Sequence, residues 1–167
     1  AVITGVGSVF NGARVQAGST VAVIGVGGVG LNIVQGAFLA GAERIIAVDL
    51  NEEKLALATT FGATDAVNGA DVDAVAAVVE MTSGGVDYAF EAIGLSATAA
   101  QAVQMVRPGC TAYLVGLPAA GVPIELPGTA LVLQQRGLQG LFMGANQFKR
   151  DIPMLANQIG RASCRER

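Results

Sequence analysis

A glycine-rich turn directly after a short apolar run is the feature of this 167-residue sequence that most restricts its fold. The turn, Gly25-Val26-Gly27-Gly28-Val29-Gly30, has the spacing G-x-G-x-x-G and follows the β-branched run Thr20–Ile24. Such a run is typical of a strand buried on both faces, and the small residues of Val29–Ala40 fit a helix. A strand, a glycine turn and a helix in this order predict a βαβ unit whose turn can approach a pyrophosphate.

The rest of the chain alternates between short strand-like runs and helix-length amphipathic stretches. Strands separated by crossovers of this length must be parallel, with helices on both faces of the sheet. The sequence therefore predicts an α/β fold with a doubly wound parallel six-stranded sheet, which is the Rossmann fold. After Thr20–Ile24, the expected strands are Arg44–Val48, Ala66–Val67, Val86–Phe90, Thr111–Val115 and Leu138–Met143.

Capping residues locate three further helices. Asn51 is expected to cap a helix that has two glutamates in its first turn and ends near Gly62. Asp71 is expected to cap a second helix, and Ser96 a third that stops at Pro108-Gly109. The positions expected to face the core are Val72, Val75, Ala76 and Val79 on the second helix, and Ala99, Val103 and Val106 on the third.

An acidic residue stands where the second expected strand ends, 19 residues after Gly30. There Asp49 would accept hydrogen bonds from both hydroxyls of an adenosine ribose. No arginine follows it to meet a 2′-phosphate, which favours NAD over NADP. Asp49 could instead cap the next helix, although Asn51 suits that role better. Lys54, one helical turn further along, could cover the face of the adenosine or could simply be a solvated lysine. Glycines at the ends of the later strands would allow the backbone to come close to a flat ring. They are also consistent with simple turns.

Composition excludes several classes of function. The chain is 52% hydrophobic and 14% charged, which rules out disorder, and glycines and prolines interrupt its apolar runs before they reach the length of a membrane span. A net charge of −3 with ten lysines and arginines indicates no nucleic-acid partner. The absence of histidine excludes histidine-based catalysis or metal binding, so we expect no catalytic or metal-ligating residue here. Cys110 and Cys164 match no metal-ligand spacing, and so few cysteines favour a reducing cytoplasm.

The two ends of the chain differ in character from its middle. The chain opens on Ala1, and the first methionine is Met81, which fits an excised domain and removal of an initiator methionine equally well. No basic segment precedes the apolar start, so a signal peptide is not expected. Residues 1–160 are expected to form one NAD-binding domain. Residues 161–167, which include Arg165-Glu166-Arg167, are expected to be a disordered or non-native tail.

Several ordered motifs resemble the zinc-type medium-chain alcohol dehydrogenases, in particular the class III or S-(hydroxymethyl)glutathione dehydrogenases. The resemblance extends over Val2–Asn157 but covers only the cofactor domain of that family. It implies a domain that holds NAD while hydride passes between an alcohol and an aldehyde. It also implies a zinc whose ligands lie outside this chain, one of them a cysteine just before Ala1, so that this chain alone binds NAD(H) without turnover. The matching runs are Gly18–Leu31, Gly41–Asp49, Phe61–Asp65, Gly85–Gly94 and Val115–Pro118.

The resemblance also assigns roles to individual residues. Thr4 matches a threonine beside the nicotinamide, and Leu95 replaces an arginine of some members, which removes one ribose or phosphate contact. The remaining matches are Gly25, Gly27, Gly28, Val29 and Gly30 at the pyrophosphate turn; Asp49, Leu50 and Lys54 at the adenosine; Ala92 and Ile93 flanking the cofactor; Val115, Gly116 and Leu117 on the nicotinamide side; and Leu141, Phe142 and Met143 at the carboxamide.

Three other classes of function compete with this interpretation. A zinc-free quinone or enoyl reductase domain of the same superfamily would usually prefer NADP and lack an acid at Asp49. A non-catalytic nucleotide-sensing Rossmann domain would explain the missing zinc ligands but not the match at Thr4. A methyltransferase does not suit the sixth strand or Gly140–Gly144.

Association is expected through the last strand. Leu138–Met143 is apolar and uncharged, and an unprotected edge strand is a template for another chain. The resemblance implies a homodimer, or a dimer of dimers, through residues 138–143. The alternative is an edge covered by Val122–Gln134.

Overall fold

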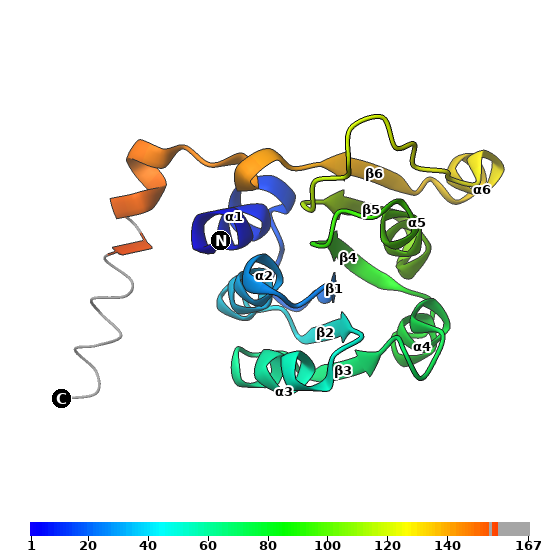
Figure 1. Cartoon of the computed structure of the whole chain (residues 1–167), viewed down its shortest axis with the longest axis horizontal. Coiled ribbons are helices and arrows are strands. Elements are labelled where there is room, and N and C mark those ends of the chain that lie inside the picture. The colour runs from blue at the N-terminus through cyan, green and yellow to red at the C-terminus, as the bar shows by residue number, and fades with distance from the viewer. Residues whose placement is uncertain (154, 157–167) are drawn as a thin grey trace.

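Six parallel strands form one sheet in the order β3-β2-β1-β4-β5-β6, as Figure 1 shows from the bottom to the top of the view. The computed structural model describes residues 1–153, 155 and 156. The predicted doubly wound α/β fold is confirmed. The strands are β1 (Thr20–Ile24), β2 (Arg44–Asp49), β3 (Asp65–Asn68), β4 (Val86–Glu91), β5 (Val106–Leu114) and β6 (Gly137–Gly140).

Helices cover both faces of the sheet (Figure 1). One face carries α1 (Val2–Gly7), the π-helical turn η1 (Ser8–Ala13), α2 (Gly28–Leu39) and α3 (Glu52–Thr60). The other carries α4 (Ala74–Met81), α5 (Ser96–Met105) and α6 (Gly128–Gln134). A short 3-10 turn, η2 (Phe142–Ala145), follows β6 and contacts α1. No helix among the described residues is both long enough and apolar enough to cross a membrane.

Alternate residues of each central strand enter two separate cores. On β1, Val21 and Val23 pack with α2 and α3, whereas Ala22 and Ile24 pack with α4 and α5. All four are at most 2% exposed. A strand buried on both faces cannot carry the alternating polar pattern of a surface strand, which is why Thr20–Ile24 reads as a continuous apolar run.

The start of α3 agrees with the prediction. The Asn51 side-chain oxygen accepts a hydrogen bond from the Lys54 amide at 3.0 Å, and so satisfies one of the free amides of the first turn. After the helix, Gly62 has a φ of +109° and lies against Phe38, in a backbone conformation that favours glycine.

The predicted start of α4 is wrong by two residues. Asp73 rather than Asp71 caps this helix, by accepting from the Ala76 amide at 3.0 Å. The carbonyl of Asn68 accepts from the Asp71 and Val72 amides, so these residues form a turn after β3 and cannot enter the helix. The inward residues are therefore Ala74 and Val78, and Val72 is 52% exposed.

The boundary between α5 and β5 also differs from the prediction. Ser96 is the first residue of α5 and donates to the Pro123 carbonyl, so it does not cap the helix. The helix ends at Met105, because a residue before proline, here Arg107, disfavours the helical conformation. Val106 is buried, but as the first residue of β5, where it pairs with Val86 before an irregularity that contains Pro108-Gly109.

The last strand is shorter than predicted, since β6 ends at Gly140 and Phe142–Met143 lie in η2. Leu141 donates its amide to the Leu114 carbonyl at 2.8 Å, but its side chain is buried against Gly12. The chain then turns through left-handed conformations at Met143 and Gly144. Asn146 holds this turn by donating to the Ile3 carbonyl at 2.8 Å.

A buried carboxylate attaches the segment after η2 to η1. Asp151 is 1% exposed and accepts from the Asn11 side chain, the Gln147 amide and the Arg150 guanidinium, at 2.7–2.8 Å. These hydrogen bonds, that of Arg150 first, hold the pKa of Asp151 below its ordinary value. The predicted tail at residues 161–167 lies outside the described residues.

An ion pair joins the first residues of β2 and β3, and it generates a prediction about pH. The Arg44 guanidinium contacts both carboxylate oxygens of Asp65 at 2.8 Å and keeps the pKa of that carboxyl low. A lowered pKa stabilises the fold above the ordinary carboxyl pKa, and this contribution is lost as the pH falls through the folded value. We expect Asp65→Asn to lower the free energy of unfolding by about 1 kcal/mol at pH 7.

Urea unfolding of the parent and the variant at pH 7, pH 5 and pH 3 measures this difference. The difference should persist at pH 5 and shrink at pH 3, which lies below the ordinary carboxyl pKa, because the unfolded chain binds a proton there more readily than the folded Asp65 does. Asp71→Asn is the matched control, because Asp71 is exposed and belongs to none of the ion pairs among the described residues. A difference of the same size at pH 3 would contradict the assignment.

Candidate functional site

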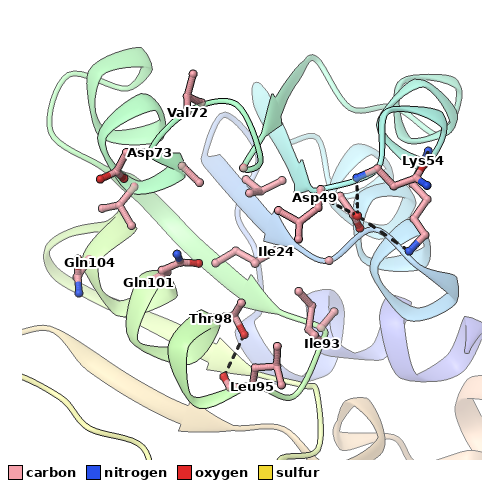
Figure 2. A pocket seen from close by; sticks show the side chains of 18 of the residues that line it. Ile24, Asp49, Lys54, Val72, Asp73, Ile93, Leu95, Thr98, Gln101 and Gln104 are labelled. Atoms are coloured by element: carbon pink, nitrogen blue, oxygen red, sulfur yellow. Dashed lines mark hydrogen bonds and ion pairs between the residues drawn. The ribbon is translucent and has the colours of Figure 1, made fainter.

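A cleft of about 1130 Å³ opens at the carboxyl ends of β1, β2 and β4. The sheet order reverses between β1 and β4, because β1 leads to β2 and β3 on one side and β4 leads to β5 and β6 on the other. Ligands of open parallel sheets bind at such a switch point. Figure 2 shows the two walls, one with Asp49 and Lys54 and the other with Ile93, Leu95 and Thr98.

The three glycines of the motif differ in what surrounds them. A Cβ at Gly30 would lie 1.9 Å from the Gly25 carbonyl oxygen, and one at Gly25 would lie 2.3 Å from the Ile93 side chain. Gly25 also has a φ of +85°. A Cβ at Gly27 would meet no atom within 4 Å. Gly25 and Gly30 are therefore needed by the fold itself, whereas Gly27 leaves the backbone open toward the cleft.

The first turn of α2 offers free amides beside this opening. Gly27 precedes the helix in an extended conformation and has no side chain to cap it. The amides of a first helical turn have no partner within the helix, and the helix dipole adds positive potential. With 12 residues, α2 is long enough for this effect, and an anionic group is the ligand that its start favours.

Asp49 ends β2 inside the cleft and is only 11% exposed at its side chain. One carboxylate oxygen accepts from the Val26 amide at 2.9 Å, and the other from Leu50 and Asn51 at 2.8 and 3.1 Å. The Lys54 ammonium lies 4.0 Å away. Asp49 thus attaches the glycine turn to β2, and Asn51, not Asp49, caps α3. The structure brings Asp49 and Lys54 together, as Figure 2 shows.

The opposite wall comes from the loop after β4 and from α5. Ala92 and Ile93 line the cleft, and Ile93 remains 47% exposed although it contacts Gly25. Leu95 and Thr98 continue this wall. Apolar side chains on both walls suit a flat ring between them, and Lys54 is the only basic side chain among the described residues that line the cleft.

The cleft continues between α4 and α5, over residues that sequence reasoning missed. Val72 was assigned to the core, but it lies at this end of the cleft, next to Asp73 (Figure 2). The sequence holds a second possible cap at Asp73, two residues after Asp71. A helix that starts after Asp73 leaves Val72 outside it, and this could have indicated that Val72 does not face the core. The other missed lining residues include Ile24, Val48, Asn51, Gly69, Val75, Gln101 and Gln104.

A second group of predicted residues lies outside this cleft, at the ends of β5 and β6 and on α1. Thr4 on α1 packs against η2, since a Cβ at Gly144 would lie 2.4 Å from the Thr4 carbonyl oxygen. Phe142 is 81% exposed, and Met143 follows it in the same turn. Leu141 is buried and can offer a ligand only its backbone. The structure therefore places the backbone of Thr4 against Gly144, in the turn that also contains Phe142 and Met143.

The loop Val115–Leu117 packs directly against the loop after β4. A Cβ at Gly116 would lie 2.2 Å from the Gly94 amide nitrogen, so the two loops touch backbone to backbone. Leu117 is 86% exposed. The three remaining predicted residues, Gly28, Val29 and Gly30, form the first turn of α2 and do not line the cleft.

The described residues contain no group of three or more histidine, cysteine, aspartate or glutamate side chains able to hold a metal ion. Cys110 is a free thiol whose pKa is raised by burial, and it lies far from the glycine turn, beside Asp87 and Arg107. Cys164 lies outside the described residues. The residues that the structure describes therefore do not fit a zinc ion.

Comparison with known proteins identifies a family. A family model described as "Zinc-binding dehydrogenase" matches residues 28–157. A curated relative, the probable S-(hydroxymethyl)glutathione dehydrogenase 1 of Schizosaccharomyces pombe, is 40% identical over 159 residues. The match covers 94% of this chain but 42% of that protein, so the chain spans about two fifths of the length of such relatives.

Two solved structures of dehydrogenases share the fold closely. Benzyl alcohol dehydrogenase from Acinetobacter calcoaceticus matches with a TM-score of 0.94 and 33% identity, over 96% of this chain and 44% of that one. A zinc-binding dehydrogenase from Sinorhizobium meliloti, bound to NADP, matches with a TM-score of 0.81 and 31% identity, over 84% of this chain and 42% of that one.

The unequal surroundings of Gly27 and Gly30 predict unequal effects of the same substitution. Gly30→Ala should lower the free energy of unfolding by about 3 kcal/mol, because its Cβ would overlap the Gly25 carbonyl. Gly27→Ala should change it by less than about 1 kcal/mol, because its Cβ enters open space and the backbone is already extended. Urea unfolding of both variants beside the parent checks this. Equal losses of stability would contradict the geometry.

Proposed function

Because the chain belongs to the zinc-binding dehydrogenase family, we propose that it is the NAD(H)-binding part of an alcohol dehydrogenase. The observation that carries this proposal is the glycine turn, with Gly27 open to the cleft and the start of α2 behind it. A pyrophosphate at this point would meet free amides rather than side chains. The proposed activity of the whole protein is hydride transfer between an alcohol and an aldehyde, which the names of the similar proteins support.

The proposed adenosine half of the site uses the cleft. The ribose hydroxyls would donate to Asp49, which already accepts three amides and has Lys54 nearby to offset its charge. A carboxylate can accept further hydrogen bonds at its remaining lone pairs. The adenine would lie between apolar side chains of the two walls, Leu50 and Ile93, which are 70% and 47% exposed.

The proposed nicotinamide half uses the second group of residues. Its contacts would come from Thr4, from the loop Val115–Leu117 and from the backbone of Leu141, Phe142 and Met143. The turn at Met143 and Gly144, fixed by Asn146, keeps this backbone against α1. When bound, NAD supplies the hydride acceptor, and the role of this chain is to hold that ring in one orientation.

Zinc has no place among the described residues. Its ligands are proposed to belong to the part of the relatives' length that this chain does not span. Asp49 favours NAD even though one similar structure holds NADP. The same acid argues against the quinone or enoyl reductase alternative. The cytoplasm is the proposed location, supported by the small number of cysteines, two in 167 residues.

Titration of the protein with NADH and with NADPH, followed by fluorescence, tests the proposal. The NADH dissociation constant should be at least tenfold lower, because a 2′-phosphate would meet the Asp49 carboxylate. Asp49→Asn should narrow this ratio and Asp71→Asn should leave it unchanged. Gly27→Ala should weaken NADH binding while the fold remains stable. NADPH binding as tight as NADH binding would refute the choice of NAD, and no binding of either would refute the function.

We also propose association through β6. Among the described residues this strand pairs only with β5, and Gln139 and Gly140 are exposed, so Val122–Gln134 does not cover them. On α6, which precedes β6, Val132 and Leu133 are 77% and 78% exposed. An open edge next to exposed apolar side chains suits a homodimer with the same patch on both subunits.

The direction of the β6 amides gives a test of this association. Leu141 donates its amide inward to Leu114, so the amide of the preceding residue, Gly140, points to the open edge. Gly140→Pro removes that donor, and Gly140→Ala keeps it. Light scattering over a concentration series should show dimers for the parent and Gly140→Ala and mainly monomers for Gly140→Pro. A parent that is monomeric throughout, or a proline variant that dimerises equally well, would exclude the β6 edge.

A further inference from the structure

The last residue of β4 places a carboxylate inside the protein without a cation. Glu91 is 0% exposed, and none of the ion pairs among the described residues includes it. One of its carboxylate oxygens, Oε1, accepts from the Ile93 amide at 3.0 Å, the Gly94 amide at 2.7 Å and the Thr98 hydroxyl at 2.7 Å. The carboxylate therefore holds the loop of residues 92–94, which lines the cleft, and the first turn of α5.

The main chain of the same residue holds a second loop. The Glu91 carbonyl accepts from the Val115 and Gly116 amides, both at 2.9 Å. The loop of residues 115–117 is thus also fixed to the end of β4. Glu91 makes hydrogen bonds to both loops, one set through its side chain and one through its backbone.

The two loops lie in contact with almost no space between them. A Cβ at Gly116 would lie 2.2 Å from the Gly94 nitrogen and 2.6 Å from the second carboxylate oxygen of Glu91, Oε2. A Cβ at Gly94, where φ is +93°, would lie 2.6 Å from the Leu117 carbonyl oxygen. Their spacing is therefore set by backbone contact around the Glu91 carboxylate, not by adaptable side chains.

The remaining oxygen shows that this arrangement is costly. Oε2 is buried and has no hydrogen-bond partner among the described residues. An unsatisfied buried polar atom destabilises the folded state, and an unsatisfied charged group does so more strongly. The start of α5 partly offsets this cost, because the helix dipole favours a negative charge there. Stability alone does not account for a carboxylate at this position.

Resting on the proposed function, we propose that Glu91 is a positioning residue for dinucleotide binding. It sets the distance between the loop at the adenosine cleft, residues 92–94, and the loop at the nicotinamide end, residues 115–117. A ligand that contacts both loops should depend on this distance. A ligand confined to the adenosine cleft should not.

Calorimetric titration with NADH and with AMP distinguishes these two kinds of ligand. Glu91→Leu should raise the NADH dissociation constant at least tenfold and the AMP dissociation constant by a clearly smaller factor, because AMP borders only the loop of residues 92–94 whereas NADH also reaches the loop of residues 115–117. Glu91→Gln keeps an oxygen at the Oε1 position, so both constants should stay within threefold of the parent. A general loss of structure would instead weaken NADH and AMP binding together.

Gly116→Ala gives a second test that leaves Glu91 intact and decides the question if Glu91→Leu does not fold. Its Cβ would push the two loops apart, and NADH binding should weaken while AMP binding holds. Equal weakening of both ligands, or unchanged NADH binding in Glu91→Leu or Gly116→Ala, would overturn the proposal. A parent protein that binds neither NADH nor AMP would instead refute the proposed function, and this inference with it.

Discussion

The contact between the start of α2 and the end of β1 is the constraint on which the rest of the structure depends. The backbone of α2 comes so close to the Gly25 carbonyl that a Cβ at Gly30 would lie 1.9 Å from it. This approach allows Ile33 and Val34, both fully buried, to pack onto the sheet. It also aims the free amides of the helix at the cleft. The same glycine therefore determines both the packing of α2 on the core and the direction of its free amides.

Asp49 extends this constraint to the neighbouring strand. By accepting from the Val26 amide, it fixes the glycine turn to the end of β2, and through Leu50 and Asn51 it fixes the start of α3. Because Asp49 already holds the turn and the start of α3 in place, it would need no rearrangement to accept the ribose of the proposed dinucleotide. A preorganised site gains affinity because it loses less freedom on binding.

Much of the fold could be predicted because local signals and tertiary packing agree. The run Thr20–Ile24 and the cap Asn51 each have one reasonable structure, and each adopts it. The predictions failed where two local solutions compete and a distant contact decides. Asp71 and Asp73 can both cap a helix, and the turn at Asn68 selects Asp73.

The predicted end of β6 was wrong for the same reason. Its apolar residues suit a strand, but Asn146 holds the following turn against Ile3, a residue 143 positions earlier in the chain. The turn and the acidic residue of the proposed adenosine site could be predicted from the sequence, because Gly27 and Asp49 belong to one local motif. The wall formed by Thr98 and Gln101 was not, because it depends on how α5 packs beside β4.

Glu91 shows what separates a residue that completes the fold from one that adjusts a site. A glutamate after a strand gives no sequence signal, and its burial arises only where two loops 23 residues apart meet. Gly25 and Gly30 admit no side chain, so the fold accounts for them completely. Glu91 instead retains an oxygen without a partner, and a neutral acceptor could satisfy the same three donors. An unsatisfied group that borders both halves of a site is better explained by the geometry of that site than by stability.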